Sequence, residues 1–185
     1  MRSRVEAAAA VLAELGAQVE PMAPIFDEDP EPHFDRMLQA YAWADFGALT
    51  SHQQAAVLPQ IAAWCRQGEG MSAAELTRAM IRIGEIRRRV IAACSEYDYV
   101  LAPTMAVEPY AAVSPWPAGG TQHNQFCFPF NLSEQPALSV CCGLTQAALP
   151  VGLQIIGRRF DDAGVLRVGH AYEAARGPLP RPPEL

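Results

Sequence analysis

Two short apolar segments near the C-terminal end constrain the fold most strongly. They are ALSVCC at 137–142 and PVGLQII at 150–156, and a turn at 143–149 separates them. Nearly continuous apolar runs are typical of strands that are covered on both faces. A short connection favours an antiparallel pair. We therefore expect one sheet that needs a covering layer on each side.

The rest of the chain supplies mostly helices. Apolar residues recur at three- and four-residue spacing, which predicts helices over 3–15, 32–49, 51–66 and 161–175. Pro59 is expected to weaken or kink the third of them. Ser72 and Glu75 stand at the spacing of a capping box, which predicts a long helix from there to about residue 96. At 1.5 Å per residue this helix would be roughly 36 Å long, the width of a domain.

Two more strands are expected, at 17–22 and 98–102. The segment 107–120 is rich in Pro and Gly and is predicted to be a long surface loop. Three or four strands are too few for a broad sheet. We therefore predict a single α/β domain over 1–177 that is part of a larger α/β layer, followed by a Pro-rich tail over 178–185.

Charge and cysteine content restrict the partners. The net charge is −6 and the arginines are dispersed, so no nucleic-acid partner is expected. The apolar runs fall short of a membrane span, and no signal-peptide core follows Met1. Five cysteines, two of them adjacent, do not suggest a disulfide framework. We expect reduced thiols, a cytoplasmic location, and neither a metal nor another cofactor.

One absence restricts the chemistry. All 14 basic residues are Arg, and the chain contains no Lys. A mechanism that needs a lysine amine as base, nucleophile or Schiff-base former is therefore excluded from this chain.

Several motifs together resemble the C-terminal half of the amidase signature family. Their order and spacing agree with the family, and the likeness covers nearly the whole chain. The motifs are DYVLAPT at 98–104, FNL at 130–132, QPA at 135–137, SV at 139–140, CG at 142–143, LPVGLQIIG at 149–157 and FDD at 160–162. Two positions depart from the pattern: Glu134 stands where the family often has Gly, and Cys141 where it often has Pro.

This resemblance implies an α/β/α sandwich around a mixed sheet and hydrolysis of carboxamides by a Ser–Ser–Lys triad. In that triad a neutral Lys acts as base, a bridging Ser in a cis peptide relays the proton, and a second Ser attacks the carbonyl carbon. Backbone amides of a Gly/Ser-rich loop hold the oxyanion. The family carries these groups upstream of the matched segment. With no Lys and no such loop, we expect no catalytic residue in this chain and no activity of the chain alone.

Four residues are candidates for substrate binding: His123, Asn124, Phe128 and Asn131. Asn124 lies seven residues before Asn131, and the resemblance implies that a residue at this spacing faces the substrate. His123 and Phe128 stand near it in the sequence. The alternatives are that Asn124 is an exposed loop amide, and that Asn131 bonds the backbone and fixes the turn into the next strand.

The residue types of the chain also raise two other kinds of site, that of a cysteine hydrolase and that of a zinc ion. Cys141, Cys142, His170 and Asp161 or Asp162 contain the groups of a Cys–His–Asp hydrolase. The strand pattern places the two cysteines on opposite faces, which favours buried, inert thiols. Cys127 and His123 lack the paired ligand spacing of a zinc site.

Three functions follow. The first is the C-terminal portion of an amidase, which supplies scaffold and part of the acyl pocket and acts on a small-molecule amide when joined to the N-terminal half. The second is a non-catalytic, truncated binding module, which could form a homodimer through an exposed sheet edge. The third is a part of a glutamyl-tRNA amidotransferase that resembles the A subunit of that enzyme.

Overall fold

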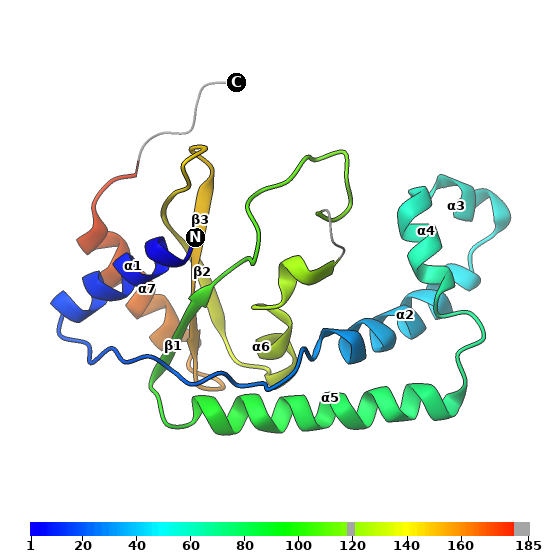
Figure 1. The fold of residues 1–185 in the computed structure, drawn as a ribbon, viewed down its shortest axis with the longest axis horizontal. Coiled ribbons are helices and arrows are strands. Elements are labelled where there is room, and N and C mark those ends of the chain that lie inside the picture. Colours follow the sequence, from blue (N-terminus) through cyan, green and yellow to red (C-terminus); the bar gives the residue numbers. More distant parts are fainter. Residues whose placement is uncertain (118–120, 180–185) are drawn as a thin grey trace.

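The computed structural model describes residues 1–117 and 121–179. The first half of the chain is helical, and the second half combines helices with a small sheet (Figure 1). The elements are α1 (Arg2–Glu14), α2 (Glu31–Gly47), α3 (Ser51–Ala56), α4 (Pro59–Arg66), α5 (Ala73–Cys94), β1 (Tyr99–Pro103), the 3-10 helix η1 (Thr121–Asn124), α6 (Phe128–Ser133), β2 (Ala137–Leu144), β3 (Pro150–Gly157) and α7 (Asp162–Arg176).

The sheet has the strand order β1-β3-β2, and both pairs are antiparallel. The hairpin predicted from the two apolar segments is therefore confirmed. Tyr99 lies opposite Gly157 in one pair, and Val140 opposite Leu153 in the other. A bulge between Cys141 and Gly143 shifts the register of β2. The central strand β3 is the most deeply buried of the three.

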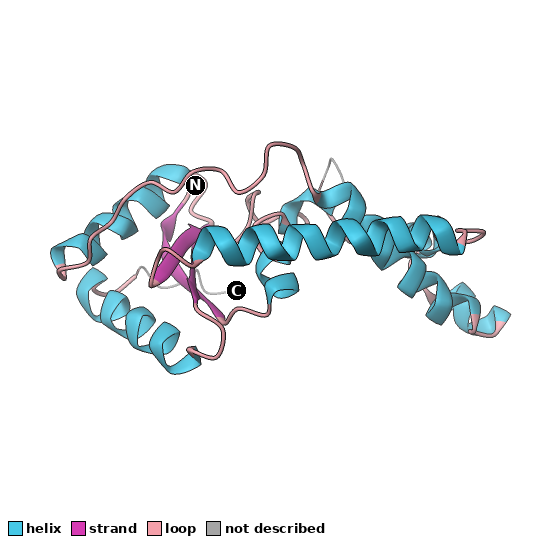
Figure 2. Cartoon of the chain, turned by 90° about the horizontal axis from the view of Figure 1, so that it is seen from below, coloured by secondary structure: helices cyan, strands magenta, loops and turns pink. Residues whose placement is uncertain are grey.

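Helices cover both faces of this sheet, as the α/β class requires (Figure 2). On one face, α1 and α7 pack on Val140, Leu153 and Ile155. On the other, Ile156 packs with residues of α5 and with Phe130 of α6. Alternate residues of a strand point to opposite faces, which explains why neighbours in β3 enter different clusters.

A third cluster lies beyond the sheet. Phe46 of α2 packs there with Ala62 and Cys65 of α4. The long helix α5 joins this end to the sheet, because α2 packs along it. None of the helices in the described parts of the chain is both long and apolar enough to cross a membrane.

The helix starts follow local sequence rules. The predicted capping box is present: the Ser72 side chain accepts from the Glu75 N–H, and Glu75 accepts from the Ser72 N–H. A second capping box, formed by Thr50 and Gln53, begins α3 and was not predicted. The single helix expected over 51–66 is divided in two. Pro59 stands in the first turn of α4, where its missing N–H costs nothing.

The strand predicted at 17–22 is not formed. Residues 17–21 are exposed and belong to no helix or strand, and no backbone hydrogen bond joins 18–22 to any described residue. An alternating pattern predicts a strand only where a neighbouring strand completes the ladder, and no strand of the described chain lies beside this segment. Of the predicted loop, 107–117 has no helix or strand and 118–120 lies outside the described residues. Most of the predicted tail, 180–185, also lies outside them.

Candidate functional site

The segment 121–127 lies over the end of β1 and is held there by hydrogen bonds. The Ala106 N–H donates to the His123 carbonyl, with 3.2 Å between the two atoms. The Cys127 thiol donates to the Thr104 carbonyl at 3.0 Å. The buried Gln154 amide donates to the Phe126 carbonyl at 2.7 Å. The end of β1 and the side chain from β3 therefore fix where the residues of this segment lie.

Two of the predicted substrate residues are neighbours in the sequence of this segment. His123 and Asn124 are half-buried, and His123 Nδ1 and Asn124 Oδ1 are buried atoms with no hydrogen-bond partner among the described residues. Buried polar atoms in folded proteins are almost always paired. Both atoms are shielded from solvent, and neither residue lines a described cavity, so a water molecule or a polar group could take up their unused hydrogen-bonding capacity only once they are uncovered.

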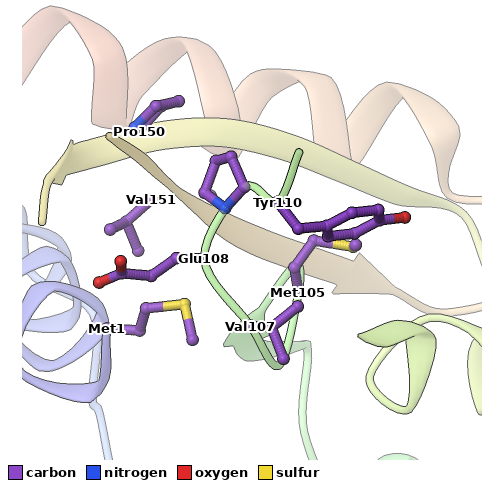
Figure 3. Close-up of a pocket in the computed structure, with 9 residues that line it drawn as sticks. Met1, Met105, Val107, Glu108, Tyr110, Pro150 and Val151 are labelled. Carbon is purple, nitrogen blue, oxygen red and sulfur yellow. The ribbon is translucent and has the colours of Figure 1, made fainter. Parts of the chain in front are cut away.

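Tyr110 connects His123 to a small cavity. The Tyr110 ring meets the His123 ring edge-on, with 5.8 Å between the ring centroids. Tyr110 also lies beside Met105 at a cavity of about 270 Å³ (Figure 3). The opposite wall comes from Met1 and from Val151 at the start of β3. This cavity is slightly smaller than a typical pocket for a drug-sized ligand.

Phe128 and Asn131 lie apart from this pair of polar atoms. Phe128 is 1% exposed and stacks on Phe34 of α2, with 4.5 Å between the ring centroids. Asn131 is exposed on α6, and its side chain has no hydrogen bond to any described residue. The turn into β2 is fixed instead by Ser133, which donates to Gln135, and by Gln135, which donates to the Gly157 carbonyl.

A larger cleft lies beside β1, and no pattern in the sequence indicates it. Its volume is about 620 Å³. We call it the β1 groove; it is lined by residues 22–30, by 100–102 of β1, and by 125, 126 and 128–130. These three segments are far apart in the sequence, and none of them contains a motif for a shared cleft. Only the folded arrangement brings them together.

The cysteines are not set up as nucleophiles. The Cys141 and Cys142 thiols donate to the backbone carbonyls of Gly143 and Val151. Burial raises the pKa of the Cys142 thiol above its ordinary value, as it also does for Cys127. A raised pKa disfavours the reactive thiolate. Both thiols of the pair are half-buried rather than fully buried, and His170 is exposed on α7.

No cluster of three or more His, Cys, Asp or Glu side chains suited to a metal ion occurs in the described part of the chain. The site as folded therefore offers hydrogen-bonding groups and apolar walls. The described residues offer it no activated nucleophile, and the sequence offers it no lysine base.

Comparison with known proteins agrees with the fold and motifs. The Amidase family model matches residues 1–166. The A subunit of the glutamyl-tRNA(Gln) amidotransferase from Brevibacillus brevis is 55% identical over 56 residues, which are 30% of this chain and 11% of that protein. Its counterpart from Myxococcus xanthus is 42% identical over 90 residues, 48% of this chain and 18% of that protein.

Solved structures extend the likeness to most of the chain. A bacterial aryl acylamidase of the amidase signature family has the same fold with a TM-score of 0.79 and 24% identity. The match covers 94% of this chain but only 39% of the solved enzyme. The chain thus spans well under half the length of the relatives named here.

Proposed function

Because the chain belongs to the Amidase family, we propose that it supplies scaffold and one wall of the substrate site of a carboxamide hydrolase. The catalytic groups come from a part of the fold that this chain does not hold. The chain by itself does not hydrolyse amides. His123 and Asn124 contact the substrate on the side of the acyl group, whereas Phe128 and Asn131, which lie apart from them, are not assigned to that wall.

The pair of buried, unpaired polar atoms carries this proposal. His123 Nδ1 and Asn124 Oδ1 have no partner among the described residues, and backbone hydrogen bonds of their own segment hold them over the end of β1. An amide substrate has both a donor and an acceptor that could pair with these atoms. The segment offers no base and no nucleophile, so we assign it a role in substrate binding and none in catalysis.

The first experiment measures the chain alone. The purified 185-residue protein is incubated with an anilide, an aliphatic amide and glutamine, and product is followed against a protein-free blank. We expect no hydrolysis above the blank, because the chain has no Lys and no Gly/Ser-rich loop. Ordinary amidase turnover by this chain would contradict the proposal.

The second experiment tests the wall in an active assembly. The chain is joined to, or mixed with, the unmatched part of the solved aryl acylamidase, and hydrolysis of an anilide is measured. We expect Asn124→Ala to raise KM about tenfold or more with a smaller change in kcat, because a ground-state contact is lost. The exposed Gln146→Ala is the matched control and should change neither constant.

The named relatives favour one particular amide. Both of the sequence relatives described above are A subunits of a glutamyl-tRNA(Gln) amidotransferase. A side-chain carboxamide such as that of glutamine is therefore a second candidate for the substrate. Release of ammonia from glutamine by the assembly, with no hydrolysis of the anilide, would favour this candidate over an aryl amide.

A further inference from the structure

The predicted surface loop extends from the sheet toward α4. We call residues 107–117 of this loop the strap. The strap follows β1 and arches toward the helices (Figure 1), and it contains neither helix nor strand. Residues 108–114 are all exposed. Because the strap is surface chain without regular structure, its attachment to the rest of the fold has to come from a few side chains.

Hydrogen bonds hold the strap to itself. The Ser114 N–H donates to the Ala111 carbonyl at 3.0 Å. The Ser114 hydroxyl donates to the Trp116 carbonyl at 2.6 Å, and the Tyr110 hydroxyl donates to the Pro115 carbonyl at 3.5 Å. No hydrogen bond or ion pair joins the strap to any other residue that the structure describes. The strap can therefore move without breaking a hydrogen bond to a described neighbour.

Two ring contacts connect the strap to the fold. The Tyr110 ring meets the His123 ring edge-on, with 5.8 Å between the centroids. The Trp116 ring lies 6.5 Å from the Trp64 ring of α4, tilted by 57°. The Trp64 indole N–H donates to Asp35 of α2 at 3.0 Å, so the helices hold Trp64 in place. Trp116 is therefore the mobile partner of this pair.

Little packing supports the first part of the strap. Residues 107–110 line the cavity of about 270 Å³ together with Pro150 and Val151 of β3 (Figure 3). Side chains beside a void lack partner atoms on that side and lose the dispersion attraction that those atoms would supply. Lifting this part of the strap from β3 thus disrupts few contacts.

Two buried polar atoms favour a lifted strap. His123 Nδ1 and Asn124 Oδ1 have no hydrogen-bond partner among the described residues. An unpaired buried polar atom destabilises the state that buries it, and water can pair with the atom once it is uncovered. Ring contacts favour the closed strap and hydrogen bonds to water favour the lifted one, so the two states lie close in free energy.

We propose that the strap is a cover that lifts from His123 and Asn124, and that the Trp116 ring latches it. Tyr110 is the part of the cover that shields the His123 ring. An amide substrate reaches the two polar atoms only while the strap is lifted. This role in substrate access rests on the proposed function, whereas the opening itself is a property of this chain alone.

Nitrogen NMR of the imidazole rings tests the opening in the free chain. Long-range ¹H–¹⁵N spectra of the ¹⁵N-labelled protein resolve Nδ1 of each ring at about pH 8.5, where an ordinary histidine is neutral. Trp116→Ala removes the ring that contacts Trp64 and leaves Tyr110 in place. We expect it to move the His123 Nδ1 shift at least halfway toward those of the exposed His52 and His170, because water then reaches the atom.

Two other substitutions complete the comparison. Tyr110→Ala removes the shielding ring and should move the His123 Nδ1 shift at least as far as Trp116→Ala. Val113→Ala changes a strap residue that is 91% exposed, and it should leave the shift unchanged. The double variant Tyr110→Ala/Trp116→Ala should match Tyr110→Ala, because both substitutions act on one opening. Unchanged β3 amide signals in every variant show that the sheet is intact.

Three results on the free chain overturn the proposal. In the first, the wild-type His123 Nδ1 shift already equals those of the exposed rings, so the atom is not covered. In the second, Trp116→Ala leaves the His123 shift unchanged, so the latch does not exist. In the third, Val113→Ala moves the shift as far as Trp116→Ala, so the effect is not specific to the latch.

The active assembly described above tests substrate access. Trp116→Ala should raise kcat/KM for the anilide about threefold or more, because a larger fraction of molecules is open. An unchanged kcat/KM would overturn the role of the strap in access. An assembly that hydrolyses no amide contradicts the proposed function instead, and the His123 Nδ1 shift in the free chain then still decides whether the strap lifts.

Discussion

Glu134 shows at the scale of one residue how this chain compensates for a departure from its family. It ends α6 in the left-handed conformation with φ 59°, where a glycine has no steric cost. Glycine is the residue that the family resemblance led us to expect here. Instead, the Glu134 carboxylate pairs with Arg87 of α5 and with Arg159 after β3. The side chain thus joins three elements, while the backbone at this residue is strained.

We predict that Glu134→Gly is more stable than Glu134→Ala by about 1 kcal/mol, because only alanine retains the left-handed steric cost. Both variants lose the same two ion pairs, so their difference isolates the backbone. Urea unfolding of the two proteins measures it. Equal midpoints would show that residue 134 is not left-handed in solution.

Tyr99 supplies a pH-dependent contact. Its hydroxyl donates to Asp161 at 2.9 Å, and this bond is the main cause that raises the pKa of Tyr99 above its ordinary value. A pKa that is higher in the folded protein stabilises the fold below the unfolded pKa, near 10. The contribution is then lost as the pH rises through the folded value.

We therefore expect wild type to be more stable than Tyr99→Phe at about pH 7 and about pH 9, both below the ordinary tyrosine pKa. The difference should shrink at about pH 11, because ionised Tyr99 repels Asp161. Unfolding in urea at these three values gives the comparison. A difference that is constant with pH would contradict the bond to Asp161.

At the scale of the elements, Gly68 allows the turn before α5 to approach α2. A Cβ at this position would meet the Gln39 carbonyl group and the Trp43 side chain. Backbone atoms of a packed helix cannot move aside as a side-chain tip can. The absence of a side chain at residue 68 is thus what lets α4 and α5 pack on the same helix.

We predict that Gly68→Ala destabilises the protein by about 1–3 kcal/mol, the usual cost of overpacking. Gly84→Ala, within α5, meets no atom closer than 3.6 Å. It should stabilise the protein by up to about 1 kcal/mol through helix propensity. Thermal unfolding followed by circular dichroism compares both with wild type. The same sign for the two substitutions would refute the close approach.

Sequence patterns predicted most elements because helices and buried strands carry their periodicity locally. The capping box at Ser72 and the hairpin of β2 and β3 are confirmed for that reason. The strand at 17–22 is wrong, because a strand also needs a neighbour. The predicted substrate residues stay a prediction, because His123 and Asn124 are consecutive in the sequence and their adjacency tests nothing. The β1 groove could not be predicted, because its walls meet only in the folded chain.

On the scale of the whole molecule, the chain has a sheet end and a helical end, joined by α2 and α5. All three tryptophans lie at the helical end. Trp43 and Trp64 pack on the cluster around Phe46, and the Trp116 ring lies 6.5 Å from that of Trp64. Tryptophan fluorescence therefore reports on the helical end alone. Amide exchange in β3 reports on the other end.

We predict that Phe46→Ala lowers the stability of the helical end by about 3 kcal/mol, because it leaves a cavity in a small cluster. The urea midpoint from fluorescence should fall, whereas the exchange rates of the β3 amides should change little. Val140→Ala is the matched substitution at the sheet end and should have the opposite pattern. Parallel changes in both probes would show that the two ends unfold as one unit.

The ion pairs between segment 22–30 and α5 depend on the ionic strength of the solution. Asp27 pairs with Arg89 and Glu28 with Arg82, and all four side chains are exposed, so mobile ions reach these charges. The Debye length shrinks from about 8 Å at physiological ionic strength to about 3 Å at 1 M salt. Concentrated salt would weaken these two ion pairs, whereas the apolar contacts of Met22, Ile25 and Phe26 with the cluster that includes α5 would persist.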